Sequence, residues 1–426
     1  MSNEALLAIG IFIVTYGLII SEKIHRTIVA MLGGGLIVLF GIVGQDTALE
    51  HIDFNTLGLL TGMMIIVSIT AETGVFKYVA IWSAKKVKGK PLYILVALSV
   101  ITAFGSAFLD NVTTVLLMVP ITFSITRQLN ISPMPFLISE ILMSNIGGTA
   151  TMIGDPPNIM IGSAVHTLTF GKFITNLTPI ILIIVIITIL LLIAIYRKQL
   201  KVDDSVRQRI VELNEKDEIN NPALMIKSLS IMLLTIIGFF LHQIIGVESA
   251  TIALLGAFLL LLLSGESYLE KSLAKVEWTT IFFFVGLFVL VSGLEETGVI
   301  KQIASFVIKL TGGNEIASSF LVLWFSSIAS AFVDNIPFVA TMIPLIQQMG
   351  TLGVHDLEPL WWSLSLGACL GGNGTLIGAS ANLIVAGLAG KEGYNISFVK
   401  YFLIGFPLML VSIVISMVYI YLRYLL

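Results

Sequence analysis

The chain has 426 residues, of which 57% are hydrophobic and only 12% are charged. Its long apolar stretches repeatedly reach the length needed to cross the hydrocarbon layer of a bilayer, which a soluble core would not require. The formal net charge of -3 gives no sign of a nucleic-acid-binding surface, and the single cysteine, Cys369, excludes an internal disulfide framework and a thiolate metal site. The composition predicts an all-α polytopic membrane protein whose chemistry rests on oxygen and amide groups.

Five apolar spans are predicted in each half of the chain. The first span follows no basic leader and no small-residue cleavage site, so we expect a retained helix and not a signal peptide. The spans of the first half are residues 5–20, 27–43, 56–70, a split segment at 135–165, and 173–196. Those of the second half are residues 223–244, 250–263, 280–294, a split segment at 360–388, and 399–421.

Two further apolar segments, residues 91–126 and 316–348, are each interrupted near the middle by an Asp-Asn pair, and we expect each to be a re-entrant hairpin. With the N-terminus outside, 19 of the 23 basic residues then fall on the cytoplasmic side, leaving Lys172, Lys301, Lys309 and Arg423 outside. Counting either hairpin as a full crossing would destroy this asymmetry. The sequence therefore predicts a multi-pass protein of the inner (plasma) membrane with both termini extracytoplasmic.

The chain also contains an internal duplication. Sliding it against itself by 224 residues, without a gap, places Glu72-Thr73-Gly74-Val75 on Glu296-Thr297-Gly298-Val299, and Asp110-Asn111 on Asp334-Asn335. Acids, amides and glycines do not recur merely because both halves are apolar. Because five crossings is an odd number, the second copy must enter from the opposite face. We predict a first inverted repeat at residues 1–196, a polar cytoplasmic linker at 197–222, and a second inverted repeat at 223–426.

The Asp-Asn pairs of the two hairpins are candidate site residues. A charge within an apolar span costs about 2.5–3.5 kcal/mol on insertion scales, and such residues are functional candidates by default. A re-entrant turn also leaves backbone groups unpaired, which is tolerated only inside protein or against a water-filled cavity. The alternative is that each Asp merely caps the returning half-helix, a role that is compatible with lining a transport path.

The two split spans are each predicted to break into two half-helices. In the first, Pro156 and Pro157 suit the first turn of a new half-helix that has Asp155 as its cap. The matching stretch from Gly371 to Asn382 lacks the acid and the prolines, so we expect asymmetric substrate contacts; close packing alone is the alternative role of the glycines. The predicted substrate- and ion-binding residues are Asp110, Asn111, Thr113, Gly148, Thr149, Thr151, Asp155, Asn158, Asp334, Asn335, Gly372, Asn373, Thr375, Ser380 and Asn382.

The other polar residues are weaker candidates for the functional site. Glu140 lies between apolar neighbours in the first split span and is a proton-relay candidate, with pairing to a buried amide as the alternative. Cys369 is expected to be a small packing residue. Three glutamates at span ends are expected at the membrane interface: Glu72, Glu295 and Glu296. The five histidines are spaced unlike metal ligands, so the sequence predicts no metal, no cofactor and no catalytic residue.

The run Ala107-Phe108-Leu109-Asp110-Asn111-Val112-Thr113-Thr114, the motif Ile153-Gly154-Asp155-Pro156-Pro157-Asn158 and the stretch Gly371–Asn382 resemble the ion transporter superfamily. The likeness is strongest to the branch that contains ArsB and the melanosomal P protein. It implies the fold of the divalent anion/sodium symporters: a scaffold domain, often dimeric, and a transport domain with two hairpins and two broken helices that moves as an elevator. A homodimer follows from this resemblance, and so does a cytoplasmic ATPase partner.

The hairpin tips depart from the sodium-dicarboxylate symporters, whose tips resemble Ser-Asn-Thr. Buried carboxylates would repel a dianion, but they suit a proton, a sodium ion or a neutral hydroxide such as arsenite. We therefore predict a secondary active transporter, a proton-coupled efflux antiporter for arsenite or antimonite, in which Asp110 and Asp334 bind proton and substrate alternately. Na⁺/H⁺ antiport and the transport of di- or tricarboxylates or chloride are the alternatives.

An enzyme is not expected. An intramembrane aspartyl protease also needs two buried aspartates, but its Gly-x-Gly-Asp motif is broken here because Met152 precedes Ile153-Gly154-Asp155 where glycine is required. The expected partners are a small inorganic substrate, the lipid bilayer and a second copy of the chain, without nucleic acid. The coupling ion is H⁺, with Na⁺ as the alternative.

Overall fold

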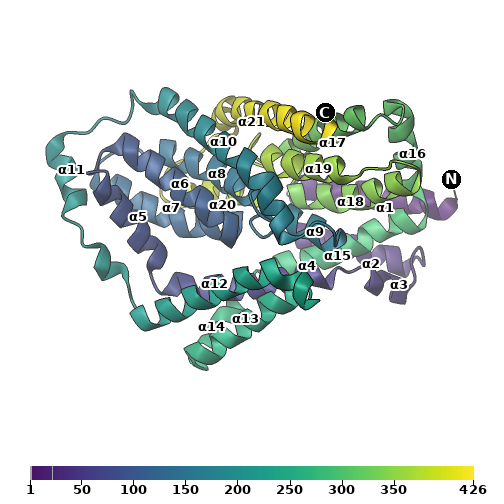
Figure 1. Ribbon diagram of the computed structural model, residues 1–426, viewed down its shortest axis with the longest axis horizontal. Helices are drawn as coiled ribbons and strands as arrows, with labels where there is room; N and C mark the ends of the chain where they lie inside the picture. Colours follow the sequence, from purple (N-terminus) through teal and green to yellow (C-terminus); the bar gives the residue numbers. More distant parts are fainter. Residues whose placement is uncertain (1, 22) are drawn as a thin grey trace.

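The computed structural model describes residues 2–21 and 23–426, and over these residues it contains helices and connecting segments without a β-strand (Figure 1). The first series of helices is α1 (Asn3–Ser21), α2 (Arg26–Leu39), α3 (Gln45–Glu50), α4 (Phe54–Glu72), α5 (Val75–Lys86), α6 (Pro91–Leu109), α7 (Asn111–Gln128), α8 (Met134–Gly148), α9 (Pro156–Ala164) and α10 (Phe170–Tyr196). Between the two series lie α11 (Asp204–Val211) and a 3₁₀ turn, η1 (Glu215–Glu218).

The second series is α12 (Pro222–Ile245), α13 (Ser249–Ser264), α14 (Ser267–Ala274), α15 (Trp278–Glu296), α16 (Val299–Thr311), α17 (Glu315–Phe332), α18 (Asn335–Thr351), α19 (Glu358–Gly371), α20 (Ser380–Lys391) and α21 (Phe398–Ile420), followed by a terminal π turn, η2 (Tyr421–Leu425). We call α6 with α7 the first hairpin and α17 with α18 the second hairpin. The arms of each hairpin contact one another.

Many of these helices are long and apolar enough to cross a membrane. In the part of the chain that is described, eight helices meet this criterion: α1, α4, α6, α10, α12, α15, α17, and α21 with its terminal turn. The chain is therefore a multi-pass membrane protein. The eight include α6 and α17, the first arms of the hairpins. Helix length and hydropathy therefore do not distinguish a full crossing from a re-entrant arm. The re-entrant path of the hairpins stays a prediction.

The helices recur with the same 224-residue offset as the motifs. Helix α4 covers residues 54–72 and α15 covers 278–296, while α6 begins at 91 and α17 at 315. Helices α5 and α16 each follow a glycine in the left-handed region, Gly74 with φ of 84° and Gly298 with φ of 74°. Every helix from α1 to α10 thus has a counterpart between α12 and α21. The opposite orientation of the two series stays a prediction.

Small residues allow the hairpins and the split helices to pack closely. Helix α8 contacts α6, and α19 contacts α17. A Cβ on Gly147 of α8 would stand 2.1 Å from the carbonyl oxygen of Ala103, and one on Gly371 of α19 would stand 2.5 Å from that of Ser327. The helix backbones therefore touch at these crossings, as is common between membrane helices.

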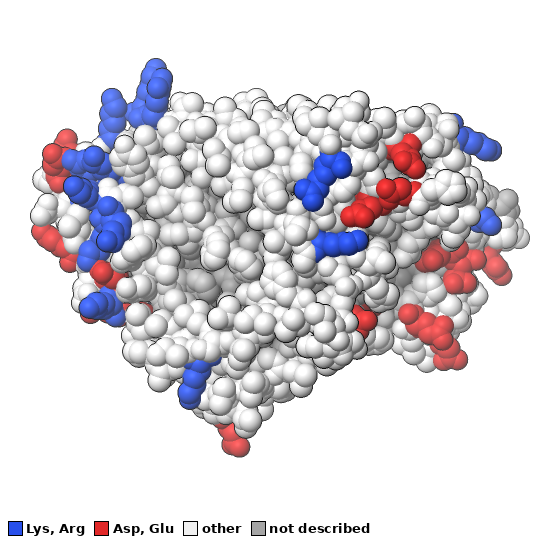
Figure 2. All heavy atoms as spheres, in the orientation of Figure 1, with Lys and Arg blue, Asp and Glu red and all other residues white. Residues whose placement is uncertain are grey.

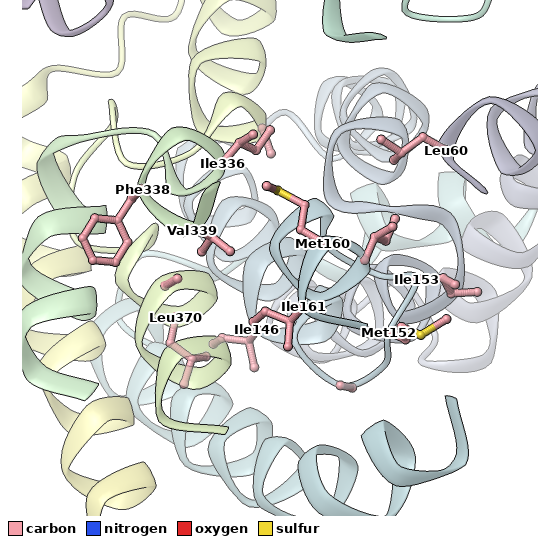
Figure 3. Packing of buried hydrophobic residues seen from close by; sticks show 14 of the residues in the cluster. Leu60, Ile146, Met152, Ile153, Met160, Ile161, Ile336, Phe338, Val339 and Leu370 are labelled. Carbon is pink, nitrogen blue, oxygen red and sulfur yellow. The ribbon is translucent and has the colours of Figure 1, made fainter. Parts of the chain in front are cut away.

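Apolar side chains fill the space around these crossings. Figure 3 shows Ile146, Ile161 and Leu370 where α8, α9 and α19 meet, with Val339 of the second hairpin nearby. All four side chains are buried. This packing holds the ends of the broken helices in place around the polar centre described below.

The basic side chains gather at one end of the molecule. Figure 2 shows most of the visible Lys and Arg at the end that carries α5 and α11, whereas acidic side chains dominate the opposite end near α3. Both chain termini lie away from the basic end (Figure 1). This is the end that the positive-inside rule predicts to face the cytoplasm.

The predicted linker is folded against the first series of helices. The Lys85 ammonium of α5 pairs with the carboxylate of Glu215 and donates to the carbonyl oxygen of Leu213 over 2.6 Å. The backbone N–H of Asn220 donates to the carbonyl oxygen of Thr73 over 3.0 Å. The hydrogen bond from Lys85 holds the pKa of the Glu215 carboxyl below its usual range, so this contact persists at neutral pH and weakens only as the pH falls through that lowered value.

The crossing of α6 and α8 gives a stability prediction. We expect Gly147→Ala to destabilise the protein by about 1–3 kcal/mol, because overpacking forces backbones apart. Gly35→Ala in α2 is the matched control, since a Cβ there meets no atom within 4 Å. Thermal unfolding in detergent should show a lower midpoint for Gly147→Ala alone; equal midpoints for both variants would contradict the packing account.

The linker contact gives a second prediction. Lys85→Met removes the ammonium that pairs with Glu215, so a glutamate-specific protease should cleave residues 204–218 faster than in the unmodified protein. Lys309→Met is the control, because Lys309 is the exposed counterpart of Lys85 at the 224-residue offset. Cleavage that is equally fast in both variants would show that Lys85 does not hold the linker.

Candidate functional site

An aspartate forms the tip of each hairpin. Asp110 lies between α6 and α7 with φ of 74°, and its carboxylate caps α7 by accepting from the backbone N–H and the hydroxyl of Thr113, over 2.8 and 2.7 Å. Asp334 lies between α17 and α18 and accepts from the N–H of Ile336 over 3.1 Å. Both aspartates therefore cap the returning arm, and both also line the cavities described below.

The two broken helices are held together by paired amides. The Asn158 side chain of α9 donates back across the break to the carbonyl oxygens of Thr149 and Thr151, over 3.2 and 2.9 Å. Its counterpart Asn382 of α20 donates to the carbonyl oxygens of Gly372 and Thr375, over 2.8 and 2.9 Å. These side chains supply hydrogen bonds that the unwound backbone lacks, as the interior of a membrane protein requires.

The carboxylate of Asp155 is the point on which both hairpin tips converge. Asn111 of the first hairpin donates to Asp155 Oδ1 over 3.3 Å, and Asn335 of the second donates to its two oxygens over 3.3 and 3.4 Å. Asp155 is fully buried. The prediction that its side chain caps α9 is wrong: Asp155 occupies the cap position but makes no cap hydrogen bond, because its carboxylate turns to the two amides.

A further amide joins this centre to the second break. Asn145 of α8 accepts from Asn111 over 3.1 Å and donates to the side-chain oxygens of Asn373 and Asn382, each over 2.9 Å. All four asparagines are buried. The sequence prediction did not include Asn145 among the site residues, although it begins the glycine-rich motif of the first break.

The cysteine lies against the same network. The side-chain oxygen of Asn158 accepts from the Ser365 hydroxyl over 2.6 Å and lies 3.6 Å from the sulfur of Cys369. Both α19 residues are fully buried. They therefore orient Asn158 and have no access to solvent.

Sequence reasoning missed two charged residues of the site, Arg26 and Glu277, which both line the inner cavity described below. Arg26, the first residue of α2, forms an ion pair with Asp334 and donates to the Ser380 hydroxyl over 2.6 Å. Its guanidinium carbon lies 4.8 Å from the ring centroid of Phe283 in α15. An arginine at the end of an apolar span usually indicates the membrane interface. The one sequence signal against that interpretation is that its counterpart at the 224-residue offset is Ala250, so the arginine is not shared by the two halves.

Two adjacent spaces, which share several lining residues, surround these residues. The inner cavity is lined by Arg26, Leu60, Met64, Asp110, Asn111, Val112, Asp155, Pro156, Glu277, Thr280, Asn335, Ile336 and Ser380. The Asp334 groove is lined by Ile19, Ile20, Ile24, His25, Arg26, Val112, Glu277, Thr279, Thr280, Phe332, Val333, Asp334, Ile377, Ser380, Leu383 and Ile384. Among the described residues that line the inner cavity, three are acidic and Arg26 is the single basic one.

Several predicted residues lie outside both spaces and stabilise the breaks instead. The Thr151 hydroxyl donates to the carbonyl oxygen of Ala107 near the end of α6. In the same way, the Thr375 hydroxyl donates to the carbonyl oxygen of Ala331 near the end of α17. Residues of this kind, which line neither space, are Thr113, Gly148, Thr149, Thr151, Asn158, Gly372, Asn373, Thr375 and Asn382. The structure thus separates residues that line the cavity from residues that shape it.

Glu140 is buried away from the inner cavity. One of its carboxylate oxygens accepts from the Thr122 hydroxyl of the first hairpin, and within the described chain the other has no hydrogen-bond partner. Its counterpart at the 224-residue offset is Leu364. A role in proton relay stays a prediction.

A second groove lies on the side related to the first by the duplication. This Asn55 groove is lined by Asn55, Leu59, Met152, Ile159, Gly162, Ser163, His166, Leu168, His242, Gln243, Gly246, Val247, Glu248 and Ser249. Asn55, Ile159 and Ser249 are the counterparts of Thr279, Leu383 and His25 in the Asp334 groove. However, no described residue of the Asn55 groove also lines the inner cavity, so of these two grooves the Asp334 groove alone adjoins it.

The family model CitMHS, described as Citrate transporter, matches residues 16–367. The chain belongs to this family. The predicted membership of the ion transporter superfamily is confirmed, and this CitMHS protein is a membrane transporter.

Its relatives support the same conclusion. The chain is 41% identical over 430 residues to the "46 kDa membrane protein" of Mycobacterium leprae (strain TN), with 99% of each chain covered. It is 40% identical over 426 residues to an uncharacterized transporter of Mycobacterium tuberculosis, again with 99% of each chain covered. It is 35% identical to the human P protein over 505 residues, which cover 98% of this chain and 60% of the P protein.

The fold of this CitMHS protein is also similar to a solved structure. It matches the YdaH transporter of Alcanivorax borkumensis, whose crystal structure is described as having an unusual topology, with a TM-score of 0.60 and 13% sequence identity. The match covers 98% of both chains. At this identity the likeness shows the all-helical transporter fold alone.

The unequal grooves predict unequal access for thiol reagents. Leu383 is 38% exposed in the Asp334 groove, whereas its counterpart Ile159 is 2% exposed. We expect Leu383→Cys to react rapidly with a charged methanethiosulfonate and Ile159→Cys to react slowly. The unsubstituted protein is the control, because its one cysteine is buried. Equal reaction of both cysteines would contradict one-sided access.

Proposed function

We propose that this CitMHS protein exchanges protons for a small neutral hydroxide, with arsenite and antimonite as the first substrates to test. The observation that carries the proposal is the convergence of Asn111 and Asn335 on the buried carboxylate of Asp155. Burial disfavours the ionised form of a carboxylate, so a carboxylate in such surroundings takes up and releases protons more readily near neutral pH than an exposed one.

The hydrogen bonds suggest how a proton at this carboxylate changes the site. Ionised Asp155 accepts from both hairpin tips at once. When one of its oxygens takes up a proton, that oxygen becomes a donor, and the bonds that the carboxyl group accepts lose their charge assistance and weaken. The protonation of Asp155 would therefore loosen its hold on Asn111 and Asn335, which links its charge to the two hairpin tips.

The charges around the cavity favour a neutral or cationic substrate. Asp110, Asp155 and Glu277 line the inner cavity, and Arg26, the basic residue among them, is already paired with Asp334. An anion entering this space would meet three carboxylates. A neutral hydroxide avoids that repulsion and finds both hydrogen-bond donors and acceptors at the tips.

Two other transport functions have an observation in their favour. The carboxylate and amide oxygens at the tips are ligands that hard cations prefer, which supports Na⁺/H⁺ antiport at the same centre. The family description, Citrate transporter, and the presence of Arg26 beside the cavity support transport of a di- or tricarboxylate or of chloride. For an anion to bind, Arg26 would have to leave Asp334.

The cellular setting is part of the proposal. We place the protein in the inner (plasma) membrane with the basic end of the molecule in the cytoplasm and both termini outside. A homodimer with elevator-type movement of the hairpins is consistent with the paired architecture, and the cytoplasmic ATPase partner rests on resemblance alone. In this orientation the Asp334 groove opens toward the cytoplasm.

Purified protein in liposomes tests the proposal. With an imposed pH gradient and an internal pH dye, arsenite or antimonite should cause proton movement, whereas Na⁺ and citrate should not. Asp155→Asn should reduce this movement to the level of protein-free liposomes, because it keeps the hydrogen-bonding shape but removes the exchangeable carboxylate.

Asp46→Asn is the control, because Asp46 lies in the short helix α3, outside the inner cavity. Full activity in the double variant Asp110→Asn, Asp334→Asn would overturn the proposal. Proton movement with Na⁺ alone would replace it by Na⁺/H⁺ antiport, and movement with citrate alone would replace it by anion transport.

A further inference from the structure

The two hairpin-tip aspartates have different surroundings. Asp334 pairs with Arg26 and accepts from the Ser380 hydroxyl over 2.7 Å. The carboxylate of Asp110 accepts from Thr113 alone among the described residues. The duplication places Ala250 at the position that corresponds to Arg26, so the other half of the chain has no arginine there to pair with Asp110. The different surroundings of the two aspartates therefore follow from the sequence.

Ser380 makes the network specific to the second hairpin. It is the first residue of α20, and it both accepts from Arg26 over 2.6 Å and donates to Asp334. Its counterpart in α9 is Pro156, which has no hydroxyl. Arg26, Asp334 and Ser380 therefore form a three-membered cluster that ties α2 to the second hairpin and to the second broken helix.

This cluster stands at the boundary between the two spaces. Arg26 and Ser380 line both the Asp334 groove and the inner cavity. Asp334 lines only the groove, whereas Asp110 and Asp155 line only the inner cavity. The Phe283 ring lies under the guanidinium and limits its freedom to turn aside.

We propose that Arg26 is a gate and positioning residue that gives the two tip aspartates different tasks. Its ion pair with Asp334 closes the passage from the Asp334 groove to the inner cavity and anchors the second hairpin to α2. Asp334 then serves the gate, and Asp110 and Asp155 are left to exchange protons. This last assignment rests on the proposed function, whereas the closure of the passage does not.

The charged groups around the gate show what opening requires. Glu277 lines both spaces beside Arg26, His25 lines the groove, and Asp110 and Asp155 face the gate from the inner cavity. A guanidinium that leaves Asp334 therefore meets other carboxylates and is not left unpaired. The approach of a charged solute that competes for Asp334 or for the guanidinium is the event that would release it.

Thiol accessibility tests the gate without any transported substrate. Met64→Cys in α4 reports on the inner cavity, and Leu383→Cys reports on the groove. We expect Arg26→Met to raise the reaction rate of Met64→Cys with a charged methanethiosulfonate about tenfold or more, which corresponds to the loss of a hydrogen bond to a charged group. The rate of Leu383→Cys should not change. Equal rates of Met64→Cys with and without Arg26 would overturn the gate.

A charge-swap variant distinguishes the loss of the gate from misfolding of the single variant. The double variant Arg26→Asp, Asp334→Arg should restore slow reaction of Met64→Cys, because it rebuilds the ion pair with reversed polarity. If Arg26 were needed only for folding, the swap would leave Met64→Cys as reactive as Arg26→Met does, and that result would also overturn the gate.

Transport measurements test the division of tasks. In liposomes, Asp334→Asn should let protons cross without substrate, because it releases the gate, whereas Asp110→Asn should abolish substrate-driven proton movement without such a leak. The same effect in both variants would show that the tip aspartates act equally. If the unsubstituted protein moves no protons with any solute, the proposed function has failed, and the thiol measurements still decide the gate.

Discussion

Backbone groups in a broken membrane helix must find hydrogen-bond partners inside the protein, because hydrocarbon supplies none. This requirement governs the centre of the molecule. Asn158 and Asn382 each span a break and donate to two carbonyl oxygens of the unwound turn. Thr151 and Thr375 then tie the same turns to the hairpins. The residues that recur at the 224-residue offset are largely those that satisfy broken backbone, which explains why the duplication is visible in amides, threonines and glycines.

The two charged residues that distinguish the centre lie at positions where the two halves of the chain differ. Asp155 has Ala379 as its counterpart, and Arg26 has Ala250. Two copies of one framework thus bring two equivalent amides, Asn111 and Asn335, to a single carboxylate. A symmetric site with an acid in each break would hold two buried carboxylates close together, and like charges at that distance oppose each other's ionisation. One acid served by both hairpins avoids that conflict and joins both halves through one carboxylate.

Much of this arrangement is predictable from the sequence. The hairpins, the broken helices and the polar tips follow from apolar length, glycines, prolines and acids, and the helix bounds agree with the expected segments to within a few residues. The short helices α3, α5, α11, α14 and α16 were not predicted, because they are too short or too polar to be recognised as membrane spans. The role of Asp155 was misjudged because local helix capping competes with tertiary hydrogen bonds from residues far away in the chain. Arg26 was missed for the same reason: its partner Asp334 is 308 positions away.

The grooves add a consequence of the duplicated framework. The Asp334 groove and the Asn55 groove share several counterpart lining positions, but only the first also shares lining residues with the inner cavity. On the closed side, Asn55 donates to the Ser163 hydroxyl over 3.0 Å and accepts from the N–H of Ala250 over 3.0 Å, which joins α4, α9 and α13. On the side of the Asp334 groove, Arg26 takes the position of Ala250, and its long side chain joins α2 to Asp334 and Ser380. If the Asn55 groove opens to the inner cavity during transport, these Asn55 contacts must break. The two sides are thus joined by different means: a side-chain ion pair on one, which can release without disturbing a helix backbone, and a contact to a backbone N–H on the other.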